Sequence, residues 1–189
     1  MQGVIVKGIS GFYYVRMEDI VVECKARGKF RYNELSPMVG DRVEISVKNN
    51  KGVIEKVLDR SNELVRPSVA NVTQAFVIFS MKNPDLNMDL LNRFLLVCEF
   101  HNLKAVICIN KMDLITEDER EKFAQRIEQM GYEIVFLKAK DGIGFDELKH
   151  RIDDNVTVLC GPSGVGKSTI LNKLSEKDIM KKVDISEKL

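Results

Sequence analysis

An apolar strand that runs directly into a glycine-rich loop and then a helix places the strongest constraint on how this 189-residue chain can fold. Residues 155–160 read NVTVLC and continue into GPSGVGKS over 161–168. These eight residues fit the pattern G-x-x-x-x-G-K-[ST], in which glycines let backbone N–H groups surround a phosphate. The loop requires a strand before it and a helix N-terminus after it. The sequence therefore predicts an α/β domain with a parallel sheet.

Residues of this loop are candidates for binding phosphate and Mg²⁺. The Lys167 ammonium can reach the β- and γ-phosphates as the catalytic cation, and the Ser168 hydroxyl can ligate Mg²⁺. A chance match to the pattern in such a chain occurs on the order of 1% of the time, so a plain strand-to-helix turn is disfavoured. The predicted phosphate-site residues are Gly161, Ser163, Gly164, Val165, Gly166, Lys167, Ser168 and Thr169.

The second part of the chain alternates between apolar strands and helices, which indicates a sheet covered on both faces. Thr116 and Glu119 have the spacing of a capping box at the start of a helix. Phe123, Ile127 and Met130 form the expected apolar stripe of that helix. The strands are expected within TQAFVIFS (73–80), KAVICIN (104–110) and YEIVFL (132–137).

The first part of the chain has a different pattern. The segments VIVKGI, GFYYVRM and IVVECKAR are rich in β-forming residues and are separated by glycines and other turn residues. We expect a small all-β barrel of five strands, of the OB type or a related type, over residues 1–65. Arg66-Pro67 marks the expected boundary, because the residue before a proline is driven toward extended conformations. The α/β domain is then expected over residues 66–189.

The motif Asn110-Lys111-Met112-Asp113 at the end of a predicted strand bears on which base the site selects. An Asp113 carboxylate can accept hydrogen bonds from guanine N1–H and the N2 amine, whereas adenine offers an acceptor and no amine there. Sites built on such bonds discriminate by on the order of 10⁴-fold or more. Asn110 can tie this loop to the phosphate loop, and the Lys111 stem can lie across the base plane.

A second loop, Lys138-Ala139-Lys140, follows the next strand and can offer the Ala139 N–H to guanine O6. GTPases usually carry Ser-Ala-Lys there, and Lys138 replaces that serine. Ordinary GTPases also carry the phosphate loop first, whereas here it follows Asp113 by about fifty residues. Adjacent strand ends define such a site whatever their order along the chain, so the domain looks circularly permuted.

A barrel followed by a permuted GTPase domain resembles the RsgA family of ribosome-assembly GTPases. The resemblance implies hydrolysis of GTP to GDP and phosphate, with Mg²⁺, stimulated by the small ribosomal subunit during its late maturation in the cytoplasm. The segments that carry it are ARGKFR (26–31), VGDRVE (39–44), RPSVANVTQ (66–74), INKMDL (109–114), GPSGVGKSTILNKL (161–174) and ISEKL (185–189).

The family continues with a switch segment and a zinc domain that these 189 residues do not contain. We therefore expect an incomplete GTPase domain from a longer protein, one that binds nucleotide but hydrolyses it poorly by itself. Zinc is expected only in that further domain, whose ligands are absent here. Cysteines 24, 98, 108 and 160 form no CxxC pair, so we expect buried, reduced thiols.

Four basic residues alternate in one segment, a pattern that by itself is more often a solvated face, but the family resemblance favours contact with ribosomal RNA. If extended, Lys25, Arg27, Lys29 and Arg31 would share one face over roughly 20 Å, and OB-type barrels bind RNA through such faces. The net charge of only +1 argues against a broad nonspecific nucleic-acid field. No apolar run approaches the roughly 18 residues of a membrane span, and we expect a monomer.

Three alternatives remain at this stage. A P-loop ATPase or kinase is disfavoured by Asp113, and another permuted GTPase family is disfavoured by the N-terminal barrel. An RNA-binding module that holds nucleotide without turning it over is the third. Comparing GDP with ADP binding separates the first alternative, and single-turnover hydrolysis separates the last.

Overall fold

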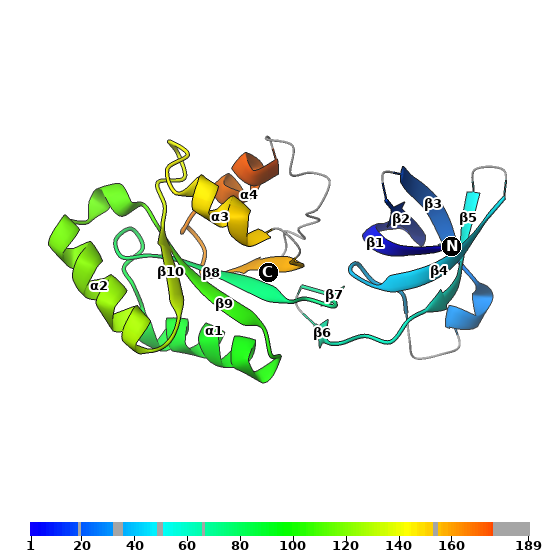
Figure 1. Cartoon of the computed structure of the whole chain (residues 1–189), viewed down its shortest axis with the longest axis horizontal. Helices are drawn as coiled ribbons and strands as arrows, with labels where there is room; N and C mark the ends of the chain where they lie inside the picture. The colour runs from blue at the N-terminus through cyan, green and yellow to red at the C-terminus, as the bar shows by residue number, and fades with distance from the viewer. Residues whose placement is uncertain (19, 32–35, 49–50, 66, 153–154, 176–189) are drawn as a thin grey trace. The chain divides into compact units, whose positions relative to one another are not determined.

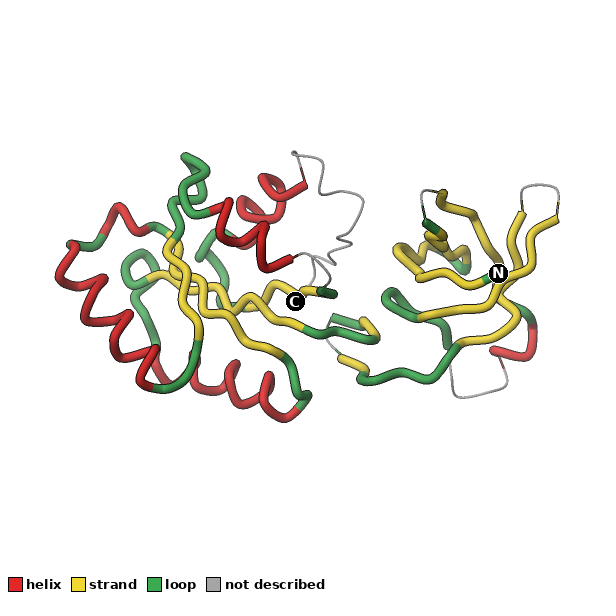
Figure 2. The backbone as a smooth tube through the Cα atoms, viewed as in Figure 1, coloured by secondary structure: helices red, strands yellow, loops and turns green. Residues whose placement is uncertain are grey.

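The computed structural model describes residues 1–18, 20–31, 36–48, 51–65, 67–152 and 155–175 (Figures 1 and 2). They form two compact units, one from Met1 to Val72 and a second that begins at Thr73. Arg66, where the sequence places the boundary, lies outside the described residues, as does the segment 185–189. No helix in the described ranges is both long enough and apolar enough to cross a membrane.

The first unit contains the predicted five-stranded barrel, closed in the order β1-β2-β3-β5-β4. Neighbouring strands pair antiparallel except β3 and β5, which run parallel. Alternate side chains point inward, so that Ile5, Val15 and Ile54 are fully buried in the barrel core. The strands are β1 (Gln2–Ile9), β2 (Phe12–Met17), β3 (Ile20–Ala26), β4 (Arg42–Lys48) and β5 (Lys51–Val57).

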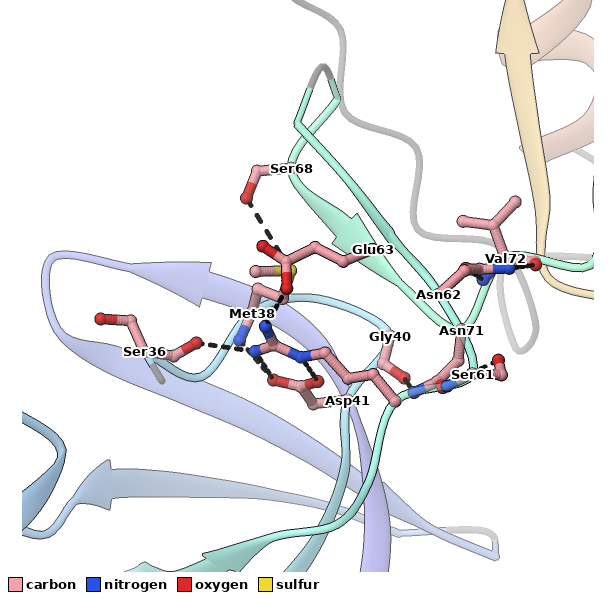
Figure 3. A network of polar contacts seen from close by, with 11 residues as sticks. Ser36, Met38, Gly40, Asp41, Ser61, Asn62, Glu63, Ser68, Asn71 and Val72 are labelled. Carbon is pink, nitrogen blue, oxygen red and sulfur yellow. Dashed lines mark hydrogen bonds and ion pairs between the residues drawn. The ribbon is translucent and has the colours of Figure 1, made fainter. Parts of the chain in front are cut away.

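A buried ion pair anchors the segment after β5 to the barrel (Figure 3). Asp41 is fully buried, and Arg60 donates to both of its oxygens, from Nε to Oδ1 at 2.7 Å and from Nη2 to Oδ2 at 2.8 Å. The Met38 N–H donates to the same Oδ2 at 2.8 Å. The hydrogen bond to Asp41 raises the pKa of Arg60 above its ordinary value. The carboxylate tolerates burial because it is paired and hydrogen-bonded.

Two short strands, β6 (Glu63–Leu64) and β7 (Val69–Ala70), pair antiparallel within the same unit. Asn71, directly after β7, accepts from the Ser61 N–H at 2.9 Å and donates to the Gly40 carbonyl at 2.9 Å (Figure 3). The segment after β5 is therefore bonded to the chain between β3 and β4 by side chains as well as by the ion pair.

The second unit contains a parallel sheet in the order β10-β9-β8-β11, as the alternating sequence predicts. Every residue of β8 is buried, which explains why the five residues between Gln74 and Ser80 are continuously apolar rather than alternating. Because all four strands are parallel, their carboxyl ends share one edge. The strands are β8 (Gln74–Ser80), β9 (Lys104–Asn110), β10 (Glu133–Phe136) and β11 (Thr157–Cys160).

Helices cover both faces of this sheet (Figure 1). One face packs against α3 and α4, whose buried residues form a single apolar cluster with those of β8, β9 and the segment after β10. On the other side, α1 lies against β8 and β9, and α2 lies against β10. The helices are α1 (Met88–Phe100), α2 (Glu117–Gln129), α3 (Phe145–Ile152) and α4 (Lys167–Ser175).

Helix α2 begins at the predicted capping box. The Thr116 side chain accepts from the Glu119 N–H at 3.2 Å, and the Glu119 carboxylate accepts from the Thr116 N–H at 2.7 Å. Phe123 and Ile127 are buried as expected. Met130 was expected on the same stripe, but it is the C-cap residue and is 43% exposed, because the helix ends before the stripe completes another turn.

Candidate functional site

The glycine-rich loop passes so close to the sheet that its first residue must be glycine. Gly161 has φ +141°, and a Cβ placed there would lie 2.0 Å from the carbonyl oxygen of Ile78 in β8. Gly164 and Gly166 also have positive φ, at 81° and 97°. These values form the tight loop between β11 and α4 and leave its backbone uncovered by side chains at three positions.

The loop and the first turn of α4 together form a cradle for an anion. Lys167 donates from Nζ to the carbonyls of Gly161 at 3.1 Å and Pro162 at 2.8 Å, so its ammonium lies over the loop. Ser168 and Thr169 follow in the first turn, which carries no acidic residue, and both are exposed. Free N–H groups and the helix dipole at this end favour negative charge.

Asn110, the last residue of β9, joins this loop to two others. Its side chain donates from Nδ2 to the Val165 carbonyl at 2.8 Å and accepts at Oδ1 from the Ala139 N–H at 3.0 Å. The side chain is almost completely buried, and a Cβ on Gly166 would lie only 2.4 Å from its Nδ2. The predicted tie between the base loop and the phosphate loop is therefore present, and Gly166 leaves the space for it.

Lys111 adds a second link between these loops. Its backbone is left-handed, with φ 61°, and its Nζ donates to the Gly164 carbonyl at 2.9 Å and to the Asn83 carbonyl. The Lys111 side chain therefore extends across the strand ends toward the phosphate loop. Asn83, in the loop after β8, is a contact that the motif did not reveal, because it depends on the order of strands in the sheet.

In the loop after β10, the Ala139 N–H has a different partner from the predicted one. We expected the Ala139 N–H to donate to guanine O6, but in this structure it donates to Asn110, and Ala139 is 3% exposed. The Lys140 carbonyl accepts from Lys173 of α4 at 2.6 Å. The loop is thus held both by the end of β9 and by the helix that follows the phosphate loop, and a guanine contact at Ala139 stays a prediction.

Asp113 lies in the short 3₁₀-helix η2 (Met112–Leu114) and is exposed. The Met112 N–H donates to the Leu137 carbonyl at 3.1 Å, which places η2 against the loop after β10. Lys138 in that loop pairs with Asp141 at 2.6 Å, and this pairing, with a smaller contribution from Asp113, raises the pKa of Lys138. An exposed carboxylate beside these loops is free to accept hydrogen bonds from a bound base.

The residues present fit a Mg²⁺ ion bound together with phosphate. The glycine-rich loop can approach the sheet this closely only because Gly161 has no Cβ, which would collide with β8. Ser168 follows the loop in the first turn of α4 and is exposed, so its hydroxyl is available as a ligand. Within the described ranges, no three His, Cys, Asp or Glu side chains are grouped to hold a metal. Ser168 and phosphate oxygens, with water, would therefore hold the ion.

The basic residues predicted to share one strand face do not do so. Lys25 lies in β3, which ends at Ala26, whereas Lys29 and Arg31 lie in the 3₁₀-helix η1 (Gly28–Arg31). Arg27 pairs with Glu55 of β5 at 2.9 Å. The four residues therefore do not lie on one extended strand as predicted, and of them only Lys25 lies in a strand, while their contact with RNA stays a prediction.

Another set of residues on the barrel, missed in the sequence, combines charge with aromatic rings. Phe12 and Tyr14 alternate with the buried Val15 and the partly buried Tyr13 along β2, so they face outward. The Lys25 Nζ lies 4.9 Å from the Phe12 ring centroid, and the Lys7 Nζ lies 5.7 Å from that of Tyr14. The alternation of GFYYVRM was the available signal.

Comparison with protein families identifies both units. The family model described as RsgA GTPase matches residues 57–189, and that described as RsgA N-terminal domain matches residues 2–54. A Clostridium perfringens protein named small ribosomal subunit biogenesis GTPase RsgA is 59% identical over 189 residues. A Clostridium botulinum protein of the same name is 60% identical over 192 residues. Both matches cover all of this chain and 66% of the relative, so the chain spans just under two thirds of their length.

Solved structures agree on the fold. The crystal structure of YloQ, described as a circularly permuted GTPase, matches with a TM-score of 0.83 and 38% identity over 94% of this chain and 65% of that one. YjeQ from Thermotoga maritima matches with a TM-score of 0.84 and 39% identity, covering 93% of this chain and 65% of that one. An OB-like barrel followed by a permuted α/β GTPase domain, with family models matching nearly every residue, shows that this chain belongs to the RsgA GTPase family.

Proposed function

We propose that the second unit binds guanine nucleotide and that the protein hydrolyses GTP to GDP and phosphate during late maturation of the small ribosomal subunit. The observation that carries this proposal is the side chain of Asn110. It bonds to the phosphate loop at Val165 and to the loop after β10 at Ala139. Two motifs about fifty residues apart in inverted order therefore border one site.

The phosphate end of this site has a defined division of roles. The loop from Gly161 to Gly166 wraps the β-phosphate with its N–H groups, and Lys167 exchanges its carbonyl partners for phosphate oxygens. Ser168 would hold Mg²⁺, which when bound neutralises charge on the β- and γ-phosphates. Thr169, in the same exposed turn, adds a hydroxyl near the helix N-terminus.

The base end selects guanine through Asp113. Its carboxylate accepts from N1–H and from the N2 amine, and adenine leaves it without those donors. A hydrogen bond to a charged group contributes about 1.5–3 kcal/mol, so losing two of them is enough for discrimination of on the order of 10²-fold or more. Lys111 and Lys140 border the base from the two loops joined by Asn110.

Asp113→Asn tests this assignment, with Asp118→Asn on exposed α2 as the matched control. Fluorescent GDP and ADP are titrated into each variant. We expect the unmodified chain to prefer GDP to ADP. Asp113→Asn should lose on the order of 10²-fold in GDP affinity, whereas the GDP affinity of Asp118→Asn should be unchanged. Equal binding of GDP and ADP by the unmodified chain, or full GDP affinity in Asp113→Asn, contradicts the proposal.

We further propose that the barrel contacts ribosomal RNA, with the chain acting as a monomer in the cytoplasm. Outward aromatic rings flanked by ammonium groups suit single-stranded RNA, because bases stack on the rings and phosphates pair with the cations. Phe12, Tyr14, Lys7 and Lys25 supply this combination on three adjacent strands. We propose them as a contact surface beside the predicted residues Lys25, Arg27, Lys29 and Arg31, which do not lie on one extended strand but whose contact with RNA stays a prediction.

The RNA proposal is tested by binding to purified small ribosomal subunits over a range of salt concentrations. Charge reversal of Lys7 and Lys25 should weaken binding. It should also flatten the slope of log affinity against log salt concentration, because two cation–phosphate contacts are lost. The control is Lys122→Glu on exposed α2. An unchanged salt slope in the double variant contradicts the proposed contact surface. An equal loss of affinity in the control shows a nonspecific charge effect and contradicts the proposed surface as well.

A further inference from the structure

The loop after β8, residues 81–87, is fastened by hydrogen bonds across its width. Ser80, the last residue of β8, is 1% exposed, and its Oγ donates to the Pro84 carbonyl at 2.9 Å. The Leu86 N–H donates to the Met81 carbonyl at 3.3 Å. Because Ser80 is buried, water competes less for its hydrogen bond than it would at the surface. The buried hydroxyl therefore fixes the middle of the loop to the end of the strand.

An ion pair fastens the same loop to α2. The Lys82 Nζ lies 2.9 Å from a carboxylate oxygen of Glu119, whose side chain also accepts from the Thr116 N–H in the capping box. Both charged side chains are partly exposed, and such pairs contribute little to stability. The Ser80 hydrogen bond is therefore the stronger of the two side-chain contacts that hold this loop.

The loop meets the nucleotide site at two points. The Asn83 carbonyl accepts from the Lys111 Nζ, which also donates to the Gly164 carbonyl at 2.9 Å. Asn83 has φ 52°, so its carbonyl points toward the lysine only in this backbone conformation. A Cβ placed on Gly164 would lie 3.8 Å from Cδ of Pro84. The loop after β8 therefore lies beside the phosphate loop and shares the Lys111 ammonium with it.

A lysine stem that lies across a base has to be restrained, because its side chain has several rotatable bonds. Carbonyls on two different loops, at Asn83 and Gly164, fix the Lys111 ammonium before any nucleotide binds. If the loop after β8 moves, one of these acceptors is lost and the stem regains freedom. Binding must then order the stem, and the apparent affinity falls with the fraction of molecules in the competent arrangement.

We infer that Ser80 is a positioning residue for nucleotide binding, which acts on Lys111 through the loop after β8. Its buried hydroxyl holds Pro84, so that the neighbouring Asn83 carbonyl meets the Lys111 ammonium. The inference rests on the proposed function and adds to it a residue that lies outside the phosphate and base motifs. A serine that served folding alone would have no energetic link to Lys111.

The test is a double-mutant cycle in GDP affinity, measured with fluorescent GDP. The four chains are the unmodified one, Ser80→Ala, Lys111→Met and the double variant. Thr157→Val is the matched control, because its buried hydroxyl accepts from Gln74 Nε2 at 3.0 Å at the opposite, amino end of the sheet. Urea unfolding of each variant shows beforehand that it is folded.

The net contribution of one hydrogen bond corresponds to about a two- to tenfold change in an equilibrium. We therefore expect Ser80→Ala to lower GDP affinity about fivefold and Thr157→Val to leave it within about twofold. Lys111→Met should lower GDP affinity by at least as much as Ser80→Ala. In the Lys111→Met chain, adding Ser80→Ala should change the affinity by less than about twofold, because the side chain through which Ser80 acts is gone.

Unchanged GDP affinity in Ser80→Ala overturns the inference. An equal loss with and without Lys111 also overturns it, because independent effects multiply. Loss of the folded state in Ser80→Ala assigns the hydroxyl to stability and rejects the inference too.

Failure of the proposed function gives a different result. In that case the unmodified chain shows no preference for GDP over ADP, and Asp113→Asn has no effect. A chain that prefers GDP through Asp113 but ignores Ser80→Ala leaves the proposed function intact and rejects Ser80 alone.

Discussion

Replacing Asn110 with alanine tests whether one buried amide holds the three loops of the site together. The amide donates to the Val165 carbonyl at 2.8 Å and accepts from the Ala139 N–H at 3.0 Å. Asn110 is 4% exposed, so solvent cannot easily take the place of the lost partners. Asn110→Ala removes both hydrogen bonds and leaves a backbone donor and a backbone acceptor without partners.

The magnitude follows from these two orphaned groups. Leaving a buried donor or acceptor unsatisfied costs about 1–3 kcal/mol, so the pair costs about 2–6 kcal/mol. Val165 is fully buried and Ala139 nearly so, which places the value away from the lower limit. We expect the free energy of unfolding of the second unit to fall by about 3–4 kcal/mol. GDP affinity falls as well, because the phosphate and base loops lose their common partner.

Urea unfolding followed by circular dichroism at 222 nm measures this change, since α1 to α4 all lie in the second unit. Asn92→Ala, at an exposed position of α1, is the matched control and should change stability by less than about 0.5 kcal/mol. A loss below that value in Asn110→Ala, together with unchanged GDP affinity, would show that Asn110 does not join the loops. The site would then lack the physical link on which the proposed function depends.

Two further predictions concern stability. Arg60→Met leaves Asp41 buried without its partner and should destabilise the first unit by about 3–5 kcal/mol, measured by hydrogen exchange in the barrel. The double variant with Asp41→Asn should recover stability. A loss under about 1 kcal/mol in Arg60→Met contradicts the pairing. Hydrogen bonding to the Thr116 N–H, then to Lys82, lowers the pKa of Glu119 below its ordinary value of 4.5. The stabilisation from Glu119 is therefore present above about pH 4.5 and is lost as the pH falls through the lower folded pKa. Glu119→Gln should reduce this acid dependence in urea unfolding at pH 6 and pH 3, and an unchanged dependence contradicts it.

Local features of the chain were predictable because short-range physics determines them. The capping box at Thr116 depends on residues three positions apart, and the alternation of β2 depends on a two-residue period. The phosphate loop follows the same logic, since positive φ at Gly161, Gly164 and Gly166 is a local backbone requirement. The barrel, the parallel sheet and the strand–loop–helix conformation around Gly161–Gly166 were therefore correctly predicted from sequence, while phosphate binding by this loop stays a prediction.

Errors arose where a strand ended sooner than the pattern suggested. The basic stripe from Lys25 to Arg31 required an extended strand, but β3 ends at Ala26 and a 3₁₀-helix follows. Gly28 permits that turn without dictating it, so alternation of charge could not distinguish the two conformations. Met130 fell off its helical stripe for a similar reason, because α2 ends at Gln129.

Sequence alone determined the motifs from which the chemistry is predicted, a phosphate-loop pattern and a carboxylate suited to guanine, and a barrel-and-GTPase order resembling one family. Tertiary structure decided which groups meet. The register of the parallel strands brings Asn110 to Val165 and Ala139, the pairing of the barrel strands buries Asp41 against Arg60, and a hydrogen bond from the Met112 N–H to the Leu137 carbonyl joins the base loop to the loop after β10. The physical reason is that these contacts join residues far apart in the chain, so their formation depends on how strands pair and loops pack, and no local pattern records that.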